Sequence, residues 1–193
     1  MRSQSTQLIS FVRTLIAAAL LLISTGALVL AAPSGTAVHF PEIEGVTLDH
    51  AAQLLPRDFK GRLNLVLLAF RREQQPEIDS WLPELRQLAL ARPGFDYYEL
   101  PVIGPKIAPL RWVIRKGMGA KITEPGKRQR TILIFAAKAP LLGPLSIDSE
   151  ETTVVLLLDA KGRLLWRSTG PWDEGKGESL RQAVEALQPA RRR

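Results

Sequence analysis

The sequence predicts an α/β protein: a three-layer α/β/α sandwich with a mixed central sheet and an inserted basic helix. Three observations predict it. Leu63–Phe70 is a continuous apolar run of strand length, which is typical of a strand covered on both faces. An amphipathic helical pattern follows it and leads to a second strand, Phe95–Val102. Near the C-terminus, the apolar run Thr153–Leu158 continues through a turn into another strand, as in an antiparallel hairpin.

Residues 1–31 are expected to be a signal peptide or an uncleaved anchor. Arg2 and Arg13 lie in a region without acids, and Leu15–Ala32 is an apolar run interrupted only at 24–26. The end of this run favours cleavage after Ala31, although its length is also about the minimum for a membrane span. Either alternative implies an exported domain, periplasmic or in the cell envelope if the cell is bacterial. Residues 32–39 are expected to be a linker, and residues 40–188 the domain.

The first half of the domain predicts a strand–helix–strand unit. Phe40–Leu55 indicates a weak strand and then a short helical or turn segment. After the strand Leu63–Phe70, Pro76 begins a helix at a position where its missing N–H costs nothing. Apolar residues at helical spacing, Trp81 among them, are expected to face the core up to the stop at 92–94. The returning strand makes the unit parallel and right-handed.

The second half predicts an extra helix, three strands and a final helix. In order, these are the helix Pro105–Ile122, the strand Thr131–Ala137, the hairpin strands Thr153–Leu158 and Arg163–Ser168, and the helix Glu178–Leu187. Gly162 suits the left-handed position of the hairpin turn. Residues 189–193 are a basic tail. This order of elements is the plan of a thioredoxin-like domain.

Two sets of motifs resemble known families. LPRDFKG at 55–61, the strand Leu63–Phe70, and Val155–Asp159 with the turn at 161–163 resemble the peroxiredoxin and redoxin branch of the thioredoxin superfamily. A second set of motifs resembles a family of mitochondrial ATP synthase assembly factors: Tyr98–Pro101, Leu110–Met118, the strand at 130–132, and Val154–Asp159 followed by Gly162–Trp166 and Gly170. The second resemblance covers residues 55–187. It implies a thioredoxin-like core, membrane association and a role in maturing subunit a of the proton-conducting sector.

The chain contains no cysteine. An exported domain is allowed disulfides, but this one has no cysteine to form them, so it must be stable through packing alone. Redoxin chemistry requires a thiolate, and the positions at the expected strand-to-helix corner carry Glu73, Gln74 and Gln75. Cysteine-dependent peroxidase and disulfide exchange are therefore excluded. The superfamily also keeps a cis proline before the first strand of the final hairpin, where this chain has Ser149–Thr153.

The corner nevertheless keeps two cations, Arg71 and Arg72. Together with open backbone N–H groups, they form a candidate binding site for an anion or a carboxylate. The alternative is an arginine pair that is solvated or held in surface salt bridges.

A basic segment, residues 106–130, is the second candidate site. It holds eight basic residues and one acid. Its expected helix places apolar residues and cations on different faces, and the candidate contacts are Arg111, Trp112, Arg115, Lys116 and Lys121. Such a segment favours a membrane protein client or an anionic membrane surface as partner, while export disfavours nucleic acid. The alternative is a solubilising face around a packed helix.

The remaining motifs indicate no catalytic, metal or cofactor site. Gly170–Gly177 nearly fits a phosphate-binding loop but lacks the final Ser or Thr, so a helix start is expected there, not a nucleotide site. His39 and His50 are the only histidines, and they lack ligand spacing. We therefore expect a non-catalytic, exported, thioredoxin-like binding protein, an assembly or chaperone-like factor for a membrane protein complex. The alternatives are a redoxin-related oxidoreductase or peroxidase-like antioxidant protein with a degenerate active site, and a purely structural envelope protein.

Overall fold

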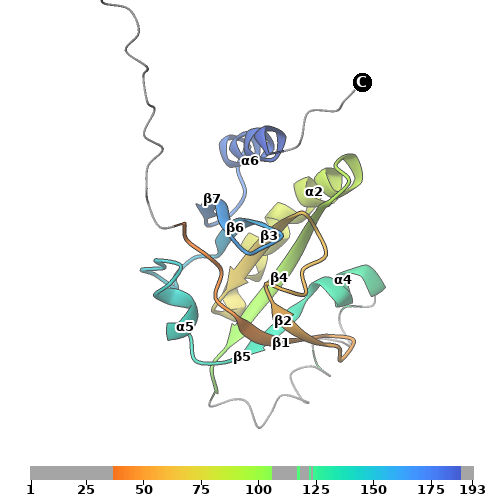
Figure 1. The fold of residues 1–193 in the computed structure, drawn as a ribbon. Helices are drawn as coiled ribbons and strands as arrows, with labels where there is room; N and C mark the ends of the chain where they lie inside the picture. Colours follow the sequence, from red (N-terminus) through yellow and green to blue (C-terminus); the bar gives the residue numbers. More distant parts are fainter. Residues whose placement is uncertain (1–36, 106–116, 118–121, 123, 188–193) are drawn as a thin grey trace, which may run out of the picture. The chain divides into compact units, whose positions relative to one another are not determined.

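A computed structural model describes residues 37–105, 117, 122 and 124–187, which belong to one compact unit beginning at Ala37 (Figure 1). Its strands are β1 (Ile43–Thr47), β2 (Ala52–Leu55), β3 (Leu63–Ala69), β4 (Phe95–Ile103), β5 (Ile132–Phe135), β6 (Val154–Asp159) and β7 (Leu164–Thr169). Its helices are the 3₁₀ turn η1 (Arg72–Gln74), α2 (Gln75–Ala91), α4 (Pro125–Arg130), α5 (Ala139–Leu142) and α6 (Glu174–Ala186).

All seven strands form one sheet in the order β2-β1-β5-β4-β3-β6-β7. β3 pairs parallel to β4 and antiparallel to β6, and β6 pairs antiparallel to β7. β4 and β5 are also parallel, so the sheet is mixed as predicted. Every residue of β3 is buried, which explains why its sequence is apolar without alternation.

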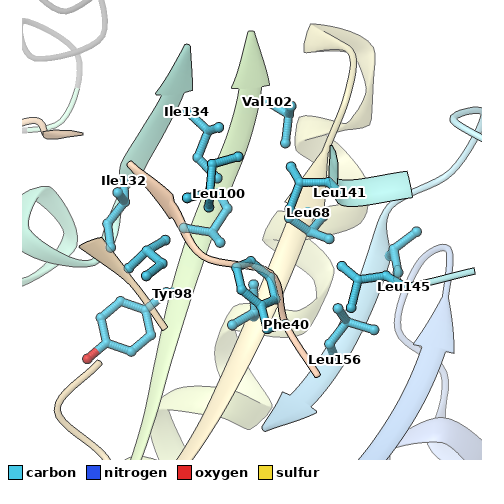
Figure 2. Close-up of a cluster of buried hydrophobic side chains, with 14 of the residues drawn as sticks. Phe40, Leu68, Tyr98, Leu100, Val102, Ile132, Ile134, Leu141, Leu145 and Leu156 are labelled. Atoms are coloured by element: carbon cyan, nitrogen blue, oxygen red, sulfur yellow. The ribbon is translucent and has the colours of Figure 1, made fainter. Parts of the chain in front are cut away.

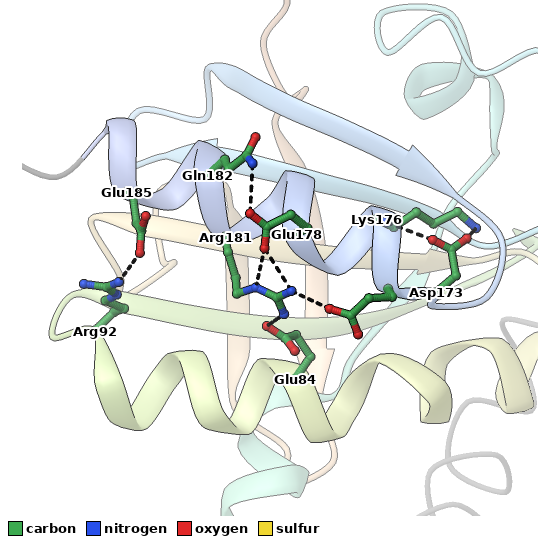
Figure 3. Close-up of polar contacts among 9 residues, drawn as sticks. Glu84, Arg92, Asp173, Lys176, Glu178, Arg181, Gln182 and Glu185 are labelled. Atoms are coloured by element: carbon green, nitrogen blue, oxygen red, sulfur yellow. Dashed lines mark hydrogen bonds and ion pairs between the residues drawn. The ribbon is translucent and has the colours of Figure 1, made fainter.

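One face of the sheet is covered by α2 and α6, which lie on the same side in Figure 3. Trp81 of α2 is fully buried, as predicted, and its Nε1 donates to the carbonyl of Gly170 at 3.0 Å. Two ion pairs join these helices (Figure 3). Nη1 of Arg181 in α6 lies 3.0 Å from Oε1 of Glu84 in α2. Nη2 of Arg92, the residue that caps the C-terminus of α2, lies 2.5 Å from Oε1 of Glu185 in α6.

The other face of the sheet carries a second apolar cluster (Figure 2). Side chains from the four central strands, β5-β4-β3-β6, pack there against Leu141 of α5, Leu145 in the following turn, and Phe40 in the segment before β1. Two apolar layers therefore enclose the sheet, and the predicted α/β class with a mixed sheet is confirmed. The expected basic helix lies outside the described residues, except for Gly117 and Ile122.

Two local expectations were wrong. Ala52–Leu55 is a strand, not a helical or turn segment: it pairs antiparallel with β1, and Leu55, opposite Ile43, is fully buried. Sheet pairing here overrides a weak local preference. The short helix α5 was also missed, because four residues carry no helical period. Gly162 does take the predicted left-handed conformation, with φ of +79°, and a Cβ there would lie 2.5 Å from Cγ of Pro56.

Candidate functional site

The candidate site is the corner where β3 runs into η1 and α2. Arg71, Arg72 and Glu73 are exposed, while Gln74 is 3% exposed and points into the corner. The chain turns sharply here because Arg71 is extended and the next residues wind into a 3₁₀ turn. Pro76 follows in the first turn of α2, as predicted.

Gln74 closes this corner with its amide group. Its Oε1 accepts from the backbone N–H of Phe70 at 2.7 Å and from that of Arg71 at 3.1 Å. Its Nε2 donates to the carbonyl of Glu150 at 2.9 Å, in the loop before β6. The amide thus satisfies three backbone groups and ties the end of β3 to that loop. A group held in this way is a structural joint and not a nucleophile.

Arg71 forms a bidentate ion pair across the corner. Its Nη1 and Nη2 donate to the two carboxylate oxygens of Glu151, at 2.7 and 2.5 Å. These hydrogen bonds hold the pKa of Arg71 above its ordinary value. Both side chains are well exposed, so the pair is easily exchanged for another. Bidentate pairing is the geometry with which arginine recognises carboxylates generally.

Arg72 is exposed and has no side-chain hydrogen bond or ion pair among the described residues. Lys138 completes the cationic border of the corner, but it is engaged with Glu150 and lies 5.7 Å from the ring centroid of Phe70. Of the two predicted arginines, which are neighbours in the sequence, Arg71 is therefore paired with Glu151, and Arg72 has no ion pair among the described residues. Chemically, this arrangement is suited to holding a carboxylate.

The residue before β6 is Thr153, where related redox proteins are expected to carry proline. Its backbone N–H donates to Glu77 of α2 at 2.8 Å. A proline lacks this N–H, so the contact requires another residue type. Among the described residues the only cis peptide bond is Leu55–Pro56, at the end of β2. The segment formed by η1 and α2 is thus joined twice to the loop before β6, through Gln74 of η1 and through Glu77 of α2.

The five predicted contacts of the basic segment, Arg111, Trp112, Arg115, Lys116 and Lys121, lie outside the described residues. The end of the segment is described, in α4. There Nζ of Lys127 lies 3.6 Å from Oε1 of Glu99. Nε of Arg128 lies 2.5 Å from Oδ1 of Asp49, and Nε of Arg130 lies 2.9 Å from Oδ1 of Asp96. These three cations therefore serve the fold, because each fastens α4 to an acid of another element.

Glu99 is the most deeply buried of these acids, at 3% exposure in β4. Burial raises the pKa of its carboxyl above the ordinary value, although Lys127 opposes the shift. Lys127 also lies 3.8 Å from Asp79 of α2, so one ammonium group serves two carboxylates. The sequence offered no signal for this cluster, because its members are far apart in the chain.

The loop at 170–177 is the start of a helix, as expected. Asp173 is the N-cap of α6 and accepts from the backbone N–H of Lys176 at 2.8 Å. Nζ of Lys176 donates to the carbonyl of Pro171 at 2.7 Å. Within the part of the chain that the structure describes, no group of three or more His, Cys, Asp or Glu could hold a metal ion. No helix within those residues is both long and apolar enough to cross a bilayer.

Comparison of the sequence with protein-family models and with curated proteins gives no match. The structure is similar to solved thioredoxin-like proteins. A thiol:disulfide interchange protein from Bacteroides sp. superposes with a TM-score of 0.51 at 19% identity, covering 82% of this chain and 93% of that one. The thioredoxin domain of a Bacteroides vulgatus thiol-disulfide oxidoreductase gives 0.52 at 17% identity, covering 78% and 99%.

BsSco, a member of the Sco family of cytochrome c oxidase assembly proteins, superposes with a TM-score of 0.52 at 11% identity, covering 79% of this chain and 96% of that one. Identities this low show the fold and no more. The chain therefore has the predicted thioredoxin-like fold, on a scaffold that contains no cysteine.

Proposed function

We propose that this protein is a non-catalytic, exported binding protein that uses its thioredoxin-like scaffold to hold a client, as an assembly or chaperone-like factor for a membrane protein complex. In this proposal the client contacts the corner through a carboxylate, which pairs with Arg72 and competes with Glu151 for Arg71. The observation that carries it is the corner itself. Gln74 occupies it with an amide bonded to three backbone groups.

The electrostatics of the corner favour an anionic partner. Arg72 has no acid partner among the described residues, and the Arg71–Glu151 pair is exposed, so a client carboxylate displaces Glu151 at little net cost. A bidentate arginine contact adds geometric specificity to charge attraction. The hydrogen bonds of Gln74 hold the backbone from which both arginine side chains project.

One resemblance supports an assembly role, and one solved structure shows that this fold occurs among assembly proteins. The resemblance of residues 55–187 to ATP synthase assembly factors implies a membrane protein client. One solved structure with the same fold, BsSco, is a member of a family of cytochrome c oxidase assembly proteins. The proposed export rests on the N-terminal sequence. The basic segment around Arg111–Lys116 is proposed as a second contact with the client or with an anionic membrane.

Site-specific photocrosslinking in cells tests the proposal. A photoreactive residue replaces Glu73, which is exposed at the corner, and the matched control replaces Lys161, which is exposed in the turn between β6 and β7. We expect position 73 to capture a defined membrane protein and position 161 not to. Adding Arg72→Glu should abolish the adduct at 73.

Identical adducts at both positions, or none at position 73, would contradict the proposal. A parallel assay of the purified protein for disulfide reduction and peroxide turnover addresses the rival enzyme. Turnover above the uncatalysed rate would contradict the proposal that this protein is not a catalyst.

A further inference from the structure

A hollow of about 180 Å³ lies at the opposite end of β3 from the corner. Its walls come from the start of β3, the loop between α2 and β4, the β6–β7 hairpin and the end of α6. The apolar lining includes Leu63, Phe95, Leu165 and Leu187. Leu187 is 41% exposed, one of three large apolar side chains that the described residues leave open to solvent.

The size of this hollow limits what it holds. Pockets for drug-sized ligands measure roughly 300–1,000 Å³, whereas an apolar cavity of about 150 Å³ accommodates benzene. The hollow therefore suits one apolar group, the size of a ring or of a single large side chain. A complete lipid chain is too large for it.

Three charged side chains line the hollow: Arg62, Arg163 and Asp159. Asp159 is already engaged, because it accepts from the backbone N–H groups of Lys161 and Arg163 at 2.8 and 2.9 Å and from Nε of Arg163 at 3.1 Å. Burial alone would raise the pKa of Asp159, but these hydrogen bonds hold it below its ordinary value, so the group is ionised. The lining thus carries a net positive charge.

Arg62 is the available cation of the three. It is exposed and has no side-chain hydrogen bond or ion pair among the described residues. Its guanidinium lies against Gly94: a Cβ built there would be 2.8 Å from Nε of Arg62. Gly94 leaves room for the guanidinium because it has no Cβ, and its left-handed backbone, with φ of +88°, also favours glycine here.

We propose that this hollow binds an apolar group that carries a carboxylate. The apolar group enters between Phe95, Leu165 and Leu187, and the carboxylate pairs with the guanidinium of Arg62. Two sources provide this chemistry: the C-terminal residue of a peptide chain, and a free small carboxylic acid. The site is independent of the client contact at the corner, because residues 62 and 72 lie at opposite ends of β3. At about 3.3 Å per residue, the length of β3 separates them by roughly 20 Å.

The test uses NMR titration of ¹⁵N-labelled residues 32–193, since every described strand and core side chain lies within 37–187. The probes are 3-phenylpropionate and the peptide Ala-Ala-Ala-Phe with a free C-terminus, each compared with its amide. We expect a free acid to shift the amide signals of Arg62, Gly94 and Leu187. Its amide should bind about tenfold more weakly or worse, because the charged hydrogen bonds are lost.

Arg62→Glu should abolish the shifts, and Leu187→Ser should weaken them. Arg72→Glu, which makes the same change in charge at the other end of β3, should leave them unchanged. Shifts with the peptide alone would identify a chain terminus as the ligand, and shifts with 3-phenylpropionate alone would identify a small carboxylate. Shifts with both acids would show that the hollow recognises the apolar group and carboxylate that they share. No shifts with either acid, equal binding of acid and amide, or full binding by folded Arg62→Glu would overturn the proposal. Loss of client capture by Arg72→Glu with intact binding here separates this site from the corner.

Discussion

Replacing Gln74 by leucine is expected to destabilise the protein by about 2 kcal/mol. The substitution puts an apolar side chain, one atom shorter than glutamine, in the corner and removes all three hydrogen bonds of the amide. The N–H of Phe70 is buried, and leaving such a donor unsatisfied costs about 1–3 kcal/mol. The N–H of Arg71 and the carbonyl of Glu150 are partly buried, so water replaces much of what they lose, and each adds about 0.5 kcal/mol. Burying leucine instead of an amide offsets part of the sum.

Urea unfolding followed by circular dichroism measures this difference, provided the dependence on urea is the same for both proteins. Gln182→Leu is the matched control, because Gln182 is exposed and donates only to exposed Glu178 at 2.9 Å. The control should stay within about 0.5 kcal/mol of the parent. If Gln74→Leu changed stability no more than the control, Gln74 would not be the structural joint of the corner.

Two further substitutions test the core and α6. Burial raises the pKa of Glu99 above 4.5, so its contribution to stability is complete below about pH 4.5 and is lost as the pH rises through the raised value. The parent should therefore lose stability relative to Glu99→Gln as the pH rises through that interval, because glutamine does not ionise. Urea unfolding at a series of pH values measures the difference, and a difference that does not change with pH would contradict the assignment. Gly177→Ala should destabilise by about 1 kcal/mol in spite of better helix propensity, because its Cβ would lie 2.8 Å from Nε1 of Trp172. Gly175→Ala, whose Cβ would meet nothing closer than 3.4 Å, should be neutral or stabilising; the same loss in both variants would point to a general intolerance of α6.

The central elements of the fold were predictable because burial leaves a regular pattern in their sequences. β3 is covered on both faces and reads as an unbroken apolar run, while Trp81 and the leucines of α2 recur at helical spacing. Gly162 marked the hairpin turn because few residues other than glycine adopt a left-handed conformation. These signals lie within short stretches of chain, where sequence patterns are informative.

Contacts between distant segments were not predictable. Gln74 was one of three polar residues near the corner, and its bond to Glu150 spans 76 positions. The cations of α4 formed part of one basic segment in the sequence, yet Lys127 and Arg130 pair with acids of β4. Charge counted along the chain therefore overstated the free positive charge of this part of the segment. The pairing of Ala52–Leu55 with neighbouring β1 was missed for a different reason, because sheet pairing overrides a weak local preference there.

The most direct test of a cysteine-free corner that binds and does not react is the affinity of the captured client segment for three proteins. These are the parent, Arg72→Glu and the charge-matched Arg62→Glu, measured by isothermal titration calorimetry. We expect at least about tenfold weaker binding for Arg72→Glu, since a charged hydrogen bond contributes about 1.5–3 kcal/mol, and parent-like binding for Arg62→Glu. Equal affinity of all three proteins, or equal loss in both variants, would contradict this expectation.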